Sequence, residues 1–244
     1  MILRMLIAGI ALLSAVSAAS AESNGLCDGV TKDFLNAKLP FAVEEIEDKQ
    51  ALKDMRLCQT VVRIRGEQVA TYTTSDKSGV LIGNLYQNKK VVAEKAVHSV
   101  NEKAFRRNEK ALNNAVAFTY KPSGSKKYIY LFTDPDCHYC EKVKAEIQQW
   151  AFEKKVDVRV VLFPLPMHPA AKEKSIRGIC GSMTFDHYVR AEYPGQSCKA
   201  GEDKIAASID VARKLAVDAT PTFIGPKGKR AVGFSRESVE KILQ

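Results

Sequence analysis

Two cysteines separated by two residues, Cys137 and Cys140, constrain the fold of this chain more than any other feature. They follow an apolar segment, 128–132, that predicts a buried strand, and they open a segment, 140–150, whose apolar spacing predicts a helix. A helix N-terminus carries partial positive charge and free backbone N–H groups, which would stabilise a thiolate at Cys137. Cys140, one turn further on, would face the helix interior and could attack a mixed disulfide. The pattern predicts a redox-active dithiol in an α/β domain.

An inert disulfide and a zinc site are the alternatives for this pair. Zinc usually requires four Cys or His ligands, and the sequence has no second close pair of cysteines. The strand-to-helix context therefore favours redox chemistry. Between the cysteines, His138 can place a positive charge beside the thiolate, which would make the oxidised pair a stronger oxidant. Tyr139 lies in the same loop, where its side chain can contact a substrate.

The first 21 residues predict a secretory signal peptide. One charge, Arg4, precedes an apolar run over residues 5–13, and small residues continue to Ala21 before Glu22. The apolar run is short for a membrane span, and no later stretch approaches the required length. We therefore expect an exported mature chain that is not embedded in a membrane.

Composition supports a globular exported protein. Lys and Arg total 37 against 28 Asp and Glu, a formal net charge of +9, and 45% of the residues are apolar. The apolar fraction supports packed cores. The basic residues are scattered along the chain, which favours a solvated basic surface over a nucleic-acid partner. All six cysteines follow the predicted cleavage site, and an even number in an exported chain suggests disulfide chemistry.

The segment 22–93 predicts a small N-terminal domain. A short helix is expected over 29–39, a polar and acidic stretch follows, and alternating patterns then predict antiparallel strands at 60–64, 69–73 and 80–82. Such a small sheet has exposed edges, so pairing with a second copy is expected.

The next segment, 94–120, predicts a linker helix and connection. Its helix has only a thin apolar stripe of Val97, Ala104 and Ala111, which suits a connector. From residue 121 the pattern alternates between α and β, beginning with a surface turn. The elements expected there are strands 128–132 and 158–163, a helical insert over 170–217, a hairpin of 222–224 with 231–232, and a final helix capped by Ser235.

Several short motifs carry a resemblance to a known family. They are Phe132-Thr133-Asp134 before the pair, Tyr139 within it, Phe163-Pro164, and Thr220-Pro221. Over its mature length the chain resembles the periplasmic thiol:disulfide isomerases of the DsbC/DsbG family, although members of that family carry Gly or Pro at the position of His138. The resemblance implies a fold of two domains, α+β and α/β: an N-terminal dimerisation domain, a linker helix and a C-terminal thioredoxin-like domain, 121–244, with a helical insert.

The resemblance also implies partners and further site residues. It implies a V-shaped homodimer around an apolar substrate cleft in the periplasm, reduction by a membrane electron donor of the DsbD type, and neither cofactor nor metal. It makes Thr220–Pro221 a cis peptide that packs against the redox pair and presents backbone to substrates. It makes Cys180 and Cys198 a structural disulfide, worth roughly 3 kcal/mol on the chain-entropy estimate.

The remaining cysteines and histidines are less constrained. Cys27 and Cys58 could form an N-terminal disulfide, link two subunits or stay free, and the first option is favoured because both precede the expected strands. The histidines at 98, 168 and 187 have no partner at helical spacing that suggests a metal site, so surface or packing roles are expected. Trp150 continues an apolar stripe and is expected in the core.

These features together predict thiol:disulfide interchange that isomerises or reduces wrong disulfides in exported proteins. Three alternatives remain open at this point: net disulfide oxidation, reduction of sulfenic acids on the same scaffold, and a dimeric holdase chaperone in which the cysteines are secondary.

Overall fold

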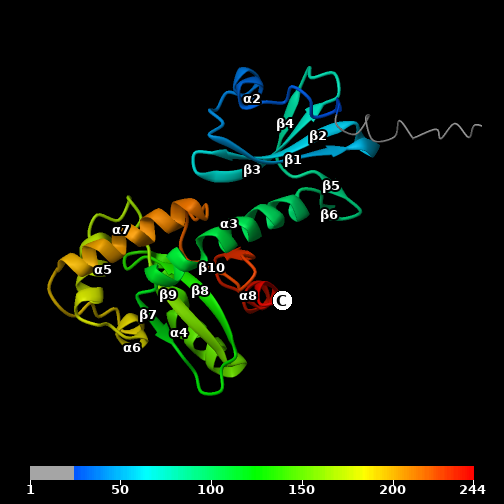
Figure 1. Ribbon diagram of the computed structural model, residues 1–244. Coiled ribbons are helices and arrows are strands. Elements are labelled where there is room, and N and C mark those ends of the chain that lie inside the picture. Colours follow the sequence, from blue (N-terminus) through cyan, green and yellow to red (C-terminus); the bar gives the residue numbers. More distant parts are fainter. Residues whose placement is uncertain (1–24) are drawn as a thin grey trace, which may run out of the picture.

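The computed structural model describes residues 25–244, in which a small N-terminal sheet and a larger C-terminal unit are joined by one long helix (Figure 1). The predicted signal peptide, 1–21, lies outside the described residues. The helices are α2 (Lys32–Lys38), α3 (Glu94–Ala115), α4 (His138–Lys154), α5 (Ala171–Cys180), α6 (Phe185–Val189), α7 (Lys199–Lys214) and α8 (Arg236–Ile242), with a short 3₁₀ turn at Lys53–Met55.

Strands form two main sheets. The N-terminal sheet has the order β1-β2-β3-β4, from β1 (Glu45–Leu52), β2 (Leu57–Ile64), β3 (Glu67–Thr74) and β4 (Val80–Ile82). A small ribbon follows, from β5 (Tyr86–Gln87) and β6 (Lys90–Val91). The C-terminal sheet has the order β11-β10-β8-β9-β7, from β7 (Phe118–Tyr120), β8 (Lys127–Thr133), β9 (Val156–Leu162), β10 (Thr222–Ile224) and β11 (Arg230–Val232).

The central strand of the N-terminal sheet, β2, is buried on both faces. Val62 packs in one cluster with Leu35 of α2, whereas Val61 packs on the other side with Ala96 and Val100 of α3. Because neighbouring residues of a strand point to opposite faces, the adjacent Val61 and Val62 are buried against different helices. A disulfide between Cys27 and Cys58, with an S–S distance of 2.08 Å, ties the start of the described chain to β2.

The first strand of this sheet was not expected from the sequence. Residues 45–52 belong to the stretch described from the sequence only as polar and acidic, yet they form β1 and pair antiparallel with β2 along most of its length. The strand lies at the sheet edge and its side chains are exposed or half-buried. Backbone pairing with β2 therefore holds a strand whose side chains carry little apolar signal. The helix expected over 29–39 is shorter, α2, and Thr31 caps it by accepting a hydrogen bond from Phe34 N at 3.1 Å.

The long helix α3 belongs to both cores. We expected a connector with a thin apolar stripe, but Val100 faces the N-terminal sheet, and Phe105 and Leu112 are buried against α7 and the C-terminal sheet. These large side chains are spaced five and seven residues apart with polar residues between them, so the sequence pattern does not reveal the buried face of the helix. The helix is thus a packed element as well as a link.

The central strand of the C-terminal sheet, β8, runs parallel to β9 and is covered by helices on both faces. Ile129 and Leu131 face one layer, which includes residues of α4, α6 and α8, whereas Tyr130 and Phe132 face α3 and α7. Trp150 is fully buried in the first layer. The element order predicted from residue 128 onward is confirmed, with Ser235 capping α8.

The C-terminal sheet begins earlier than residue 121. Residues 118–120, which we had assigned to the connection, form β7 and pair antiparallel with β9. Phe118 and Tyr120 contact the aromatic ring of Phe185 on α6. A strand of three residues is too short to show a period, so the tertiary contacts of its two aromatic rings define it.

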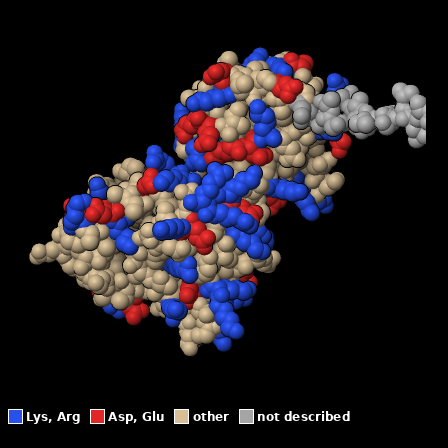
Figure 2. All heavy atoms as spheres, viewed as in Figure 1, with Lys and Arg blue, Asp and Glu red and all other residues tan. Residues whose placement is uncertain are grey.

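Charged residues meet where the two units face each other. A groove there is lined by acidic residues near β1, such as Glu44 and Glu47, and by basic residues of α3 and α7, such as Lys103 and Lys214. Figure 2 shows acidic side chains of the N-terminal unit next to basic ones around α3. Arg63 of β2 pairs with Glu47 and donates a hydrogen bond to the carbonyl of Arg213 at 3.2 Å. Within residues 25–244, no helix has the length and apolar character needed to cross a membrane.

Candidate active site

The two cysteines of the motif lie where a strand gives way to a helix, as predicted. Cys137 is the N-cap residue of α4, and its carbonyl accepts a hydrogen bond from Glu141 N at 3.0 Å. Both thiols are free; Cys137 is 5% exposed and Cys140 is fully buried. The side chain of Cys137 makes no capping hydrogen bond to the first turn of α4, and Cys140 follows within that turn.

A buried carboxylate fixes the segment before α4. Asp134 accepts hydrogen bonds from the backbone N–H of Asp136 at 2.7 Å and of Leu165 at 2.6 Å. Nδ1 of His168 lies 2.9 Å from the same carboxylate, so a histidine that looked isolated in the sequence comes next to the site. Cys137 N donates to the Asp134 carbonyl at 3.2 Å. These contacts join the loop that carries Cys137 to the loop after β9, which fixes the position of the outer thiol.

The segment before β10 completes the site. The Thr220–Pro221 peptide bond is cis, and the Sγ of Cys137 lies 3.4 Å from the carbonyl oxygen of Thr220. The carbonyl of Pro221 accepts a hydrogen bond from Gly233 N at 2.8 Å, so this segment is anchored to the hairpin of β10 and β11. The antiparallel pairing of β10 with β8 brings residues more than eighty positions apart to one site.

The inner thiol is held in its neutral form. Burial raises the pKa of Cys140 to about 11, while a backbone hydrogen bond from Asp134 and one from the Thr133 side chain act in the opposite direction. A buried thiol without a nearby solvent shell disfavours the charged state. The resting dithiol therefore has a protonated Cys140 behind the outer sulfur of Cys137.

The two residues between the cysteines face outward. His138 is exposed, Tyr139 is 70% exposed, and their rings lie 6.1 Å apart. Both are free to contact a bound protein chain.

Sequence reasoning missed two side chains behind the site, Lys144 and Tyr188. Lys144 is buried on α4, and the fully buried Tyr188 of α6 bonds its hydroxyl to that of Thr133 at 2.7 Å. A signal for Lys144 was present, because it lies four residues after Cys140 and three before Ile147, on the apolar face of the helix. No comparable pattern marked Tyr188.

Two disulfides lie apart from the dithiol in sequence and in the fold. Cys180 ends α5 and Cys198 caps α7, and their S–S distance is 2.01 Å. The disulfide joins the two longer helices of the insert. Gly201 makes room for it, since a Cβ at that position would lie 2.6 Å from the Sγ of Cys180. With Cys27–Cys58 in the N-terminal unit, four of the six cysteines are used for bridging, which leaves Cys137 and Cys140 for chemistry.

Thioredoxin-like oxidoreductases are the class that this geometry defines: a dithiol at a helix start, an outer and an inner sulfur, and a cis-proline beside the outer one. The model of the thioredoxin-like domain family matches residues 115–244, which is more than half of the chain. The chain belongs to that family.

The first of three similar solved structures supports the fold. A linker-deletion mutant of ScsC from Proteus mirabilis matches with a TM-score of 0.50 at 16% identity, over 62% of this chain and 84% of that one. The thiol-disulfide exchange protein alpha-DsbA2 from Wolbachia pipientis matches with a TM-score of 0.49 at 16% identity, over 60% and 95%. A disulfide interchange protein from Neisseria gonorrhoeae matches with a TM-score of 0.45 at 24% identity, over 55% and 98%. No curated protein matches the chain.

Proposed function

We propose that this protein is a thiol:disulfide interchange enzyme of the DsbC/DsbG type, which isomerises or reduces wrong disulfides in exported proteins. One observation carries the proposal. The outer thiol, Cys137, lies 3.4 Å from the Thr220 carbonyl next to a cis-proline, with the buried Cys140 behind it. A backbone carbonyl at this position can accept a hydrogen bond from an extended substrate chain. The disulfide of the bound substrate would then lie next to Cys137.

The reaction begins at Cys137. Its thiolate attacks one sulfur of a substrate disulfide, a new S–S bond forms, and the second substrate cysteine leaves as a thiolate. In isomerisation, another substrate thiolate attacks the mixed disulfide, so that Cys137 is released and no net oxidation occurs. In reduction, Cys140 attacks Cys137 instead, and the substrate leaves with both of its cysteines reduced while the Cys137–Cys140 disulfide forms.

Continued activity requires a source of electrons. Each reductive turnover leaves the pair oxidised, and two electrons must then come from another protein. We propose a membrane donor of the DsbD type for this step, and the periplasm as the compartment. Two structural disulfides agree with an oxidising compartment, as does the signal peptide predicted over residues 1–21.

We further propose that the N-terminal unit is a dimerisation domain. Its sheet ends at β4, where Leu81 is 61% and Ile82 is 42% exposed. An apolar strand at a sheet edge offers unpaired backbone groups to a second copy. Leu81→Asp should convert a dimer into a monomer in sedimentation analysis. Phe152→Asp, which alters an equally exposed apolar residue on α4, should leave the dimer intact. A monomeric wild-type protein would contradict this part of the proposal.

Trapping of the redox state and of the mixed disulfide tests the main proposal. Cells are quenched with acid and their free thiols are alkylated. An isomerase or reductase should be found with Cys137 and Cys140 mostly reduced, whereas an oxidase should be found with the pair mostly oxidised. A Cys140→Ala variant should accumulate mixed disulfides with exported proteins, and the variant that also carries Cys137→Ala should accumulate none. If the pair is mostly oxidised in wild-type cells, the function is net oxidation and the proposed isomerisation is contradicted.

A further inference from the structure

A buried lysine lies directly behind the dithiol. Lys144 is on α4, one turn after Cys140, and its side chain is only 2% exposed. Its ammonium group lies 2.5 Å from a carboxylate oxygen of Glu141, whose own side chain is 51% exposed. Lysine is almost never buried without a specific partner, because taking its charge out of water is costly. The mechanism above gives this residue no role.

The ammonium group is connected to the inner thiol through two hydroxyls. Nζ of Lys144 lies 4.6 Å from the centroid of the Tyr188 ring. The Tyr188 hydroxyl bonds to the Thr133 hydroxyl at 2.7 Å. Burial raises the pKa of Cys140, and hydrogen bonding from the Thr133 side chain lowers it. Tyr188 and Thr133 are both fully buried. A cation, a phenol and a hydroxyl thus lie in sequence between the exposed Glu141 and the buried sulfur.

We propose that Lys144 is a positioning residue that stabilises the Cys140 thiolate and so sets the rate at which a mixed disulfide on Cys137 is resolved. It acts through Tyr188, because a cation over the ring makes the phenol a stronger hydrogen-bond donor and aligns it with Thr133. The electric field of the ammonium also favours negative charge nearby in an interior of low dielectric constant. This inference rests on the proposed thiol:disulfide interchange.

Apart from Lys144, the titratable groups nearest to Cys140 are a thiol, carboxyl groups and phenols. Cys137 contacts it from the start of α4, and Asp134 contacts it through its backbone. Glu141 is the next residue of α4, and its side chain is 51% exposed. Tyr188 and Tyr193 face it from α6 and the loop that follows, and burial, followed in Tyr188 by the charge on Cys140, raises the pKa of both tyrosines. Further out, Asp136 is paired with Lys174 and Asp134 with His168. Among these groups, Lys144 supplies the positive charge on the buried side of the sulfur.

The step at issue conserves atoms and electrons. Cys140 loses its proton, its sulfur attacks the sulfur of Cys137, and the Cys137–Cys140 bond forms as the bond to the substrate breaks. The substrate leaves as a thiolate and takes up a proton, which balances the proton that Cys140 lost. Because burial raises the pKa of Cys140 to about 11, formation of its thiolate is the costly part of the step at neutral pH.

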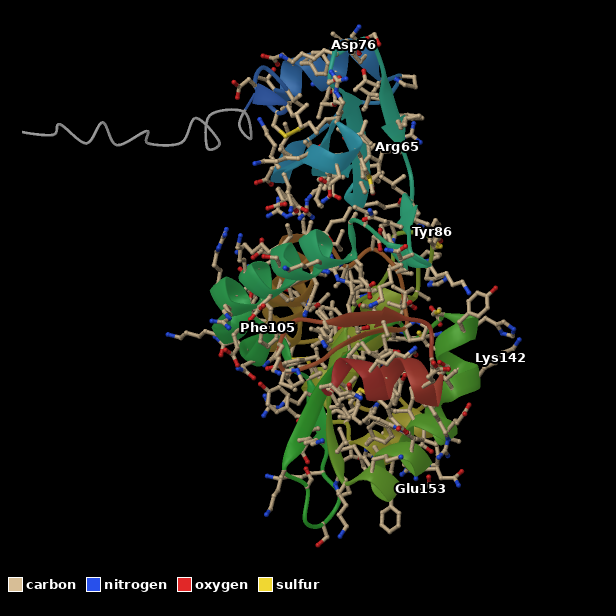
Figure 3. The ribbon with its side chains drawn as sticks, turned by 90° about the vertical axis from the view of Figure 1, so that its right-hand side faces the viewer. Arg65, Asp76, Tyr86, Phe105, Lys142 and Glu153 are labelled. Atoms are coloured by element: carbon tan, nitrogen blue, oxygen red, sulfur yellow. A yellow bond between two sulfur atoms is a disulfide. The ribbon has the colours of Figure 1, made fainter. Side chains whose placement is uncertain are left out.

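The test uses the reduced mature protein and oxidised glutathione. Cys137 first becomes glutathionylated, and Cys140 then displaces glutathione. Quenching with acid at set times and measuring mass gives the rate of the second step, which is followed from pH 5 to pH 9. Lys144→Met should slow the second step about tenfold at neutral pH and shift its pH profile upward by about one unit. The first step should change little. The matched control is Lys142→Met, because Lys142 lies on the same helix but is exposed to solvent (Figure 3).

The outcomes separate the two proposals. If wild-type protein forms no adduct at Cys137, thiol:disulfide interchange itself is contradicted. If it forms and resolves the adduct, but Lys144→Met has the rate and pH profile of Lys142→Met, the role of Lys144 is contradicted and the proposed function stands. Lys144→Arg, which keeps the charge, should restore most of the rate. If Lys144→Met does not fold, the Tyr188→Phe variant tests the inference instead. This variant removes only the hydroxyl and should also slow the second step. An unchanged rate and pH profile of the second step in Tyr188→Phe would overturn the inference.

Discussion

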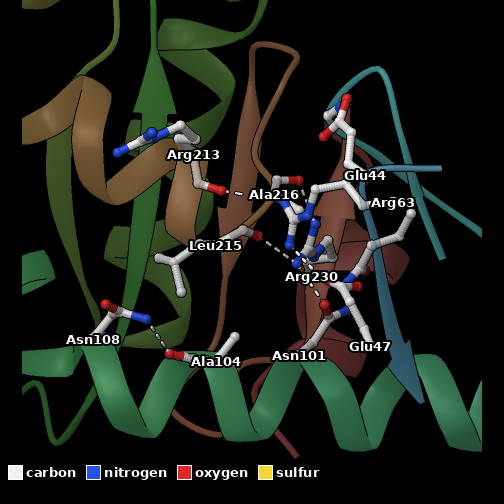
Figure 4. Close-up of polar contacts among 12 residues, drawn as sticks. Glu44, Glu47, Arg63, Asn101, Ala104, Asn108, Arg213, Leu215, Ala216 and Arg230 are labelled. Atoms are coloured by element: carbon white, nitrogen blue, oxygen red, sulfur yellow. Dashed lines mark hydrogen bonds and ion pairs between the residues drawn. The ribbon is translucent and has the colours of Figure 1, made fainter. Parts of the chain in front are cut away.

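Replacing Arg230 should destabilise the protein more than replacing any arginine on its surface. Arg230 is on β11, at the junction of α3, α7 and the C-terminal sheet (Figure 4). Its guanidinium donates hydrogen bonds to the carbonyl oxygens of Ala216 and Leu215, each at 2.6 Å, and to Oδ1 of Asn101 at 2.5 Å. Burial lowers the pKa of Arg230 to about 10, and the residue as a whole is half-buried. The residue therefore ties the end of α7 to the linker helix.

The expected cost follows from the acceptors that a substitution leaves behind. Arg230→Met removes all three hydrogen bonds while preserving most of the apolar volume. Each buried acceptor left without a donor costs about 1 kcal/mol or more, so we expect a loss of about 3 kcal/mol in the free energy of unfolding. Arg230→Lys keeps a charge but loses the planar fork and should recover less than half of that loss.

Urea unfolding monitored by tryptophan fluorescence measures this loss. Trp150 is the only tryptophan in the chain and is fully buried in the C-terminal core, so its emission reports unfolding of that unit. The control is Arg236→Met, which breaks an ion pair with Glu153 in which both side chains are 40% exposed. Such a surface pair is worth below about 1 kcal/mol. If Arg230→Met costs no more than Arg236→Met, the reasoning from buried acceptors is refuted.

Three further predictions concern the cysteines. Replacing Cys180 and Cys198 together with Ser should lower the free energy of unfolding by about 3 kcal/mol in urea, because the disulfide closes a loop of this length; a loss below about 1 kcal/mol would contradict this. Gly201→Ala should lower the melting temperature, although Ala favours helices, because its Cβ would meet the Sγ of Cys180 at 2.6 Å; a raised melting temperature would show that the disulfide shifts easily. In the native reduced protein at pH 8, iodoacetamide should label Cys137 and leave Cys140 unlabelled, because Cys140 is buried and, with its pKa raised to about 11, remains a thiol until the pH approaches that value; equal labelling at pH 8 would contradict the assignment of outer and inner sulfur.

The sequence predicted the position of the dithiol between a strand and a helix better than it predicted the surroundings of the dithiol. The dithiol was found because two cysteines, a preceding apolar strand and a following helix are all local patterns. The prediction that Thr220–Pro221 lies beside the dithiol came from a family resemblance, since no local pattern places residue 220 next to residue 137. Lys144 was missed because a single lysine on an apolar stripe resembles a solvated residue until the packing of Tyr188 above it is known.

The fold was predictable where secondary structure has a clear period and unpredictable where tertiary contacts define it. The buried strand β8 and the helix α4 have strong patterns and were found. The edge strand β1 is polar, and the strand β7 is three residues long, so both depend on pairing with a neighbour that the sequence alone does not reveal. In α3, the buried residues Val100, Phe105 and Leu112 are spaced too irregularly to predict that the helix packs on both units.

Refolding of a scrambled multi-disulfide protein in a glutathione buffer tests disulfide isomerisation at Cys137 directly. The mature protein is compared with its Cys137→Ala variant, and recovery of the client's native activity is followed. We expect the mature protein to speed the recovery and the variant to have no effect, because Cys137 is the attacking sulfur. No recovery with either protein, or equal recovery with both, would contradict disulfide isomerisation at Cys137.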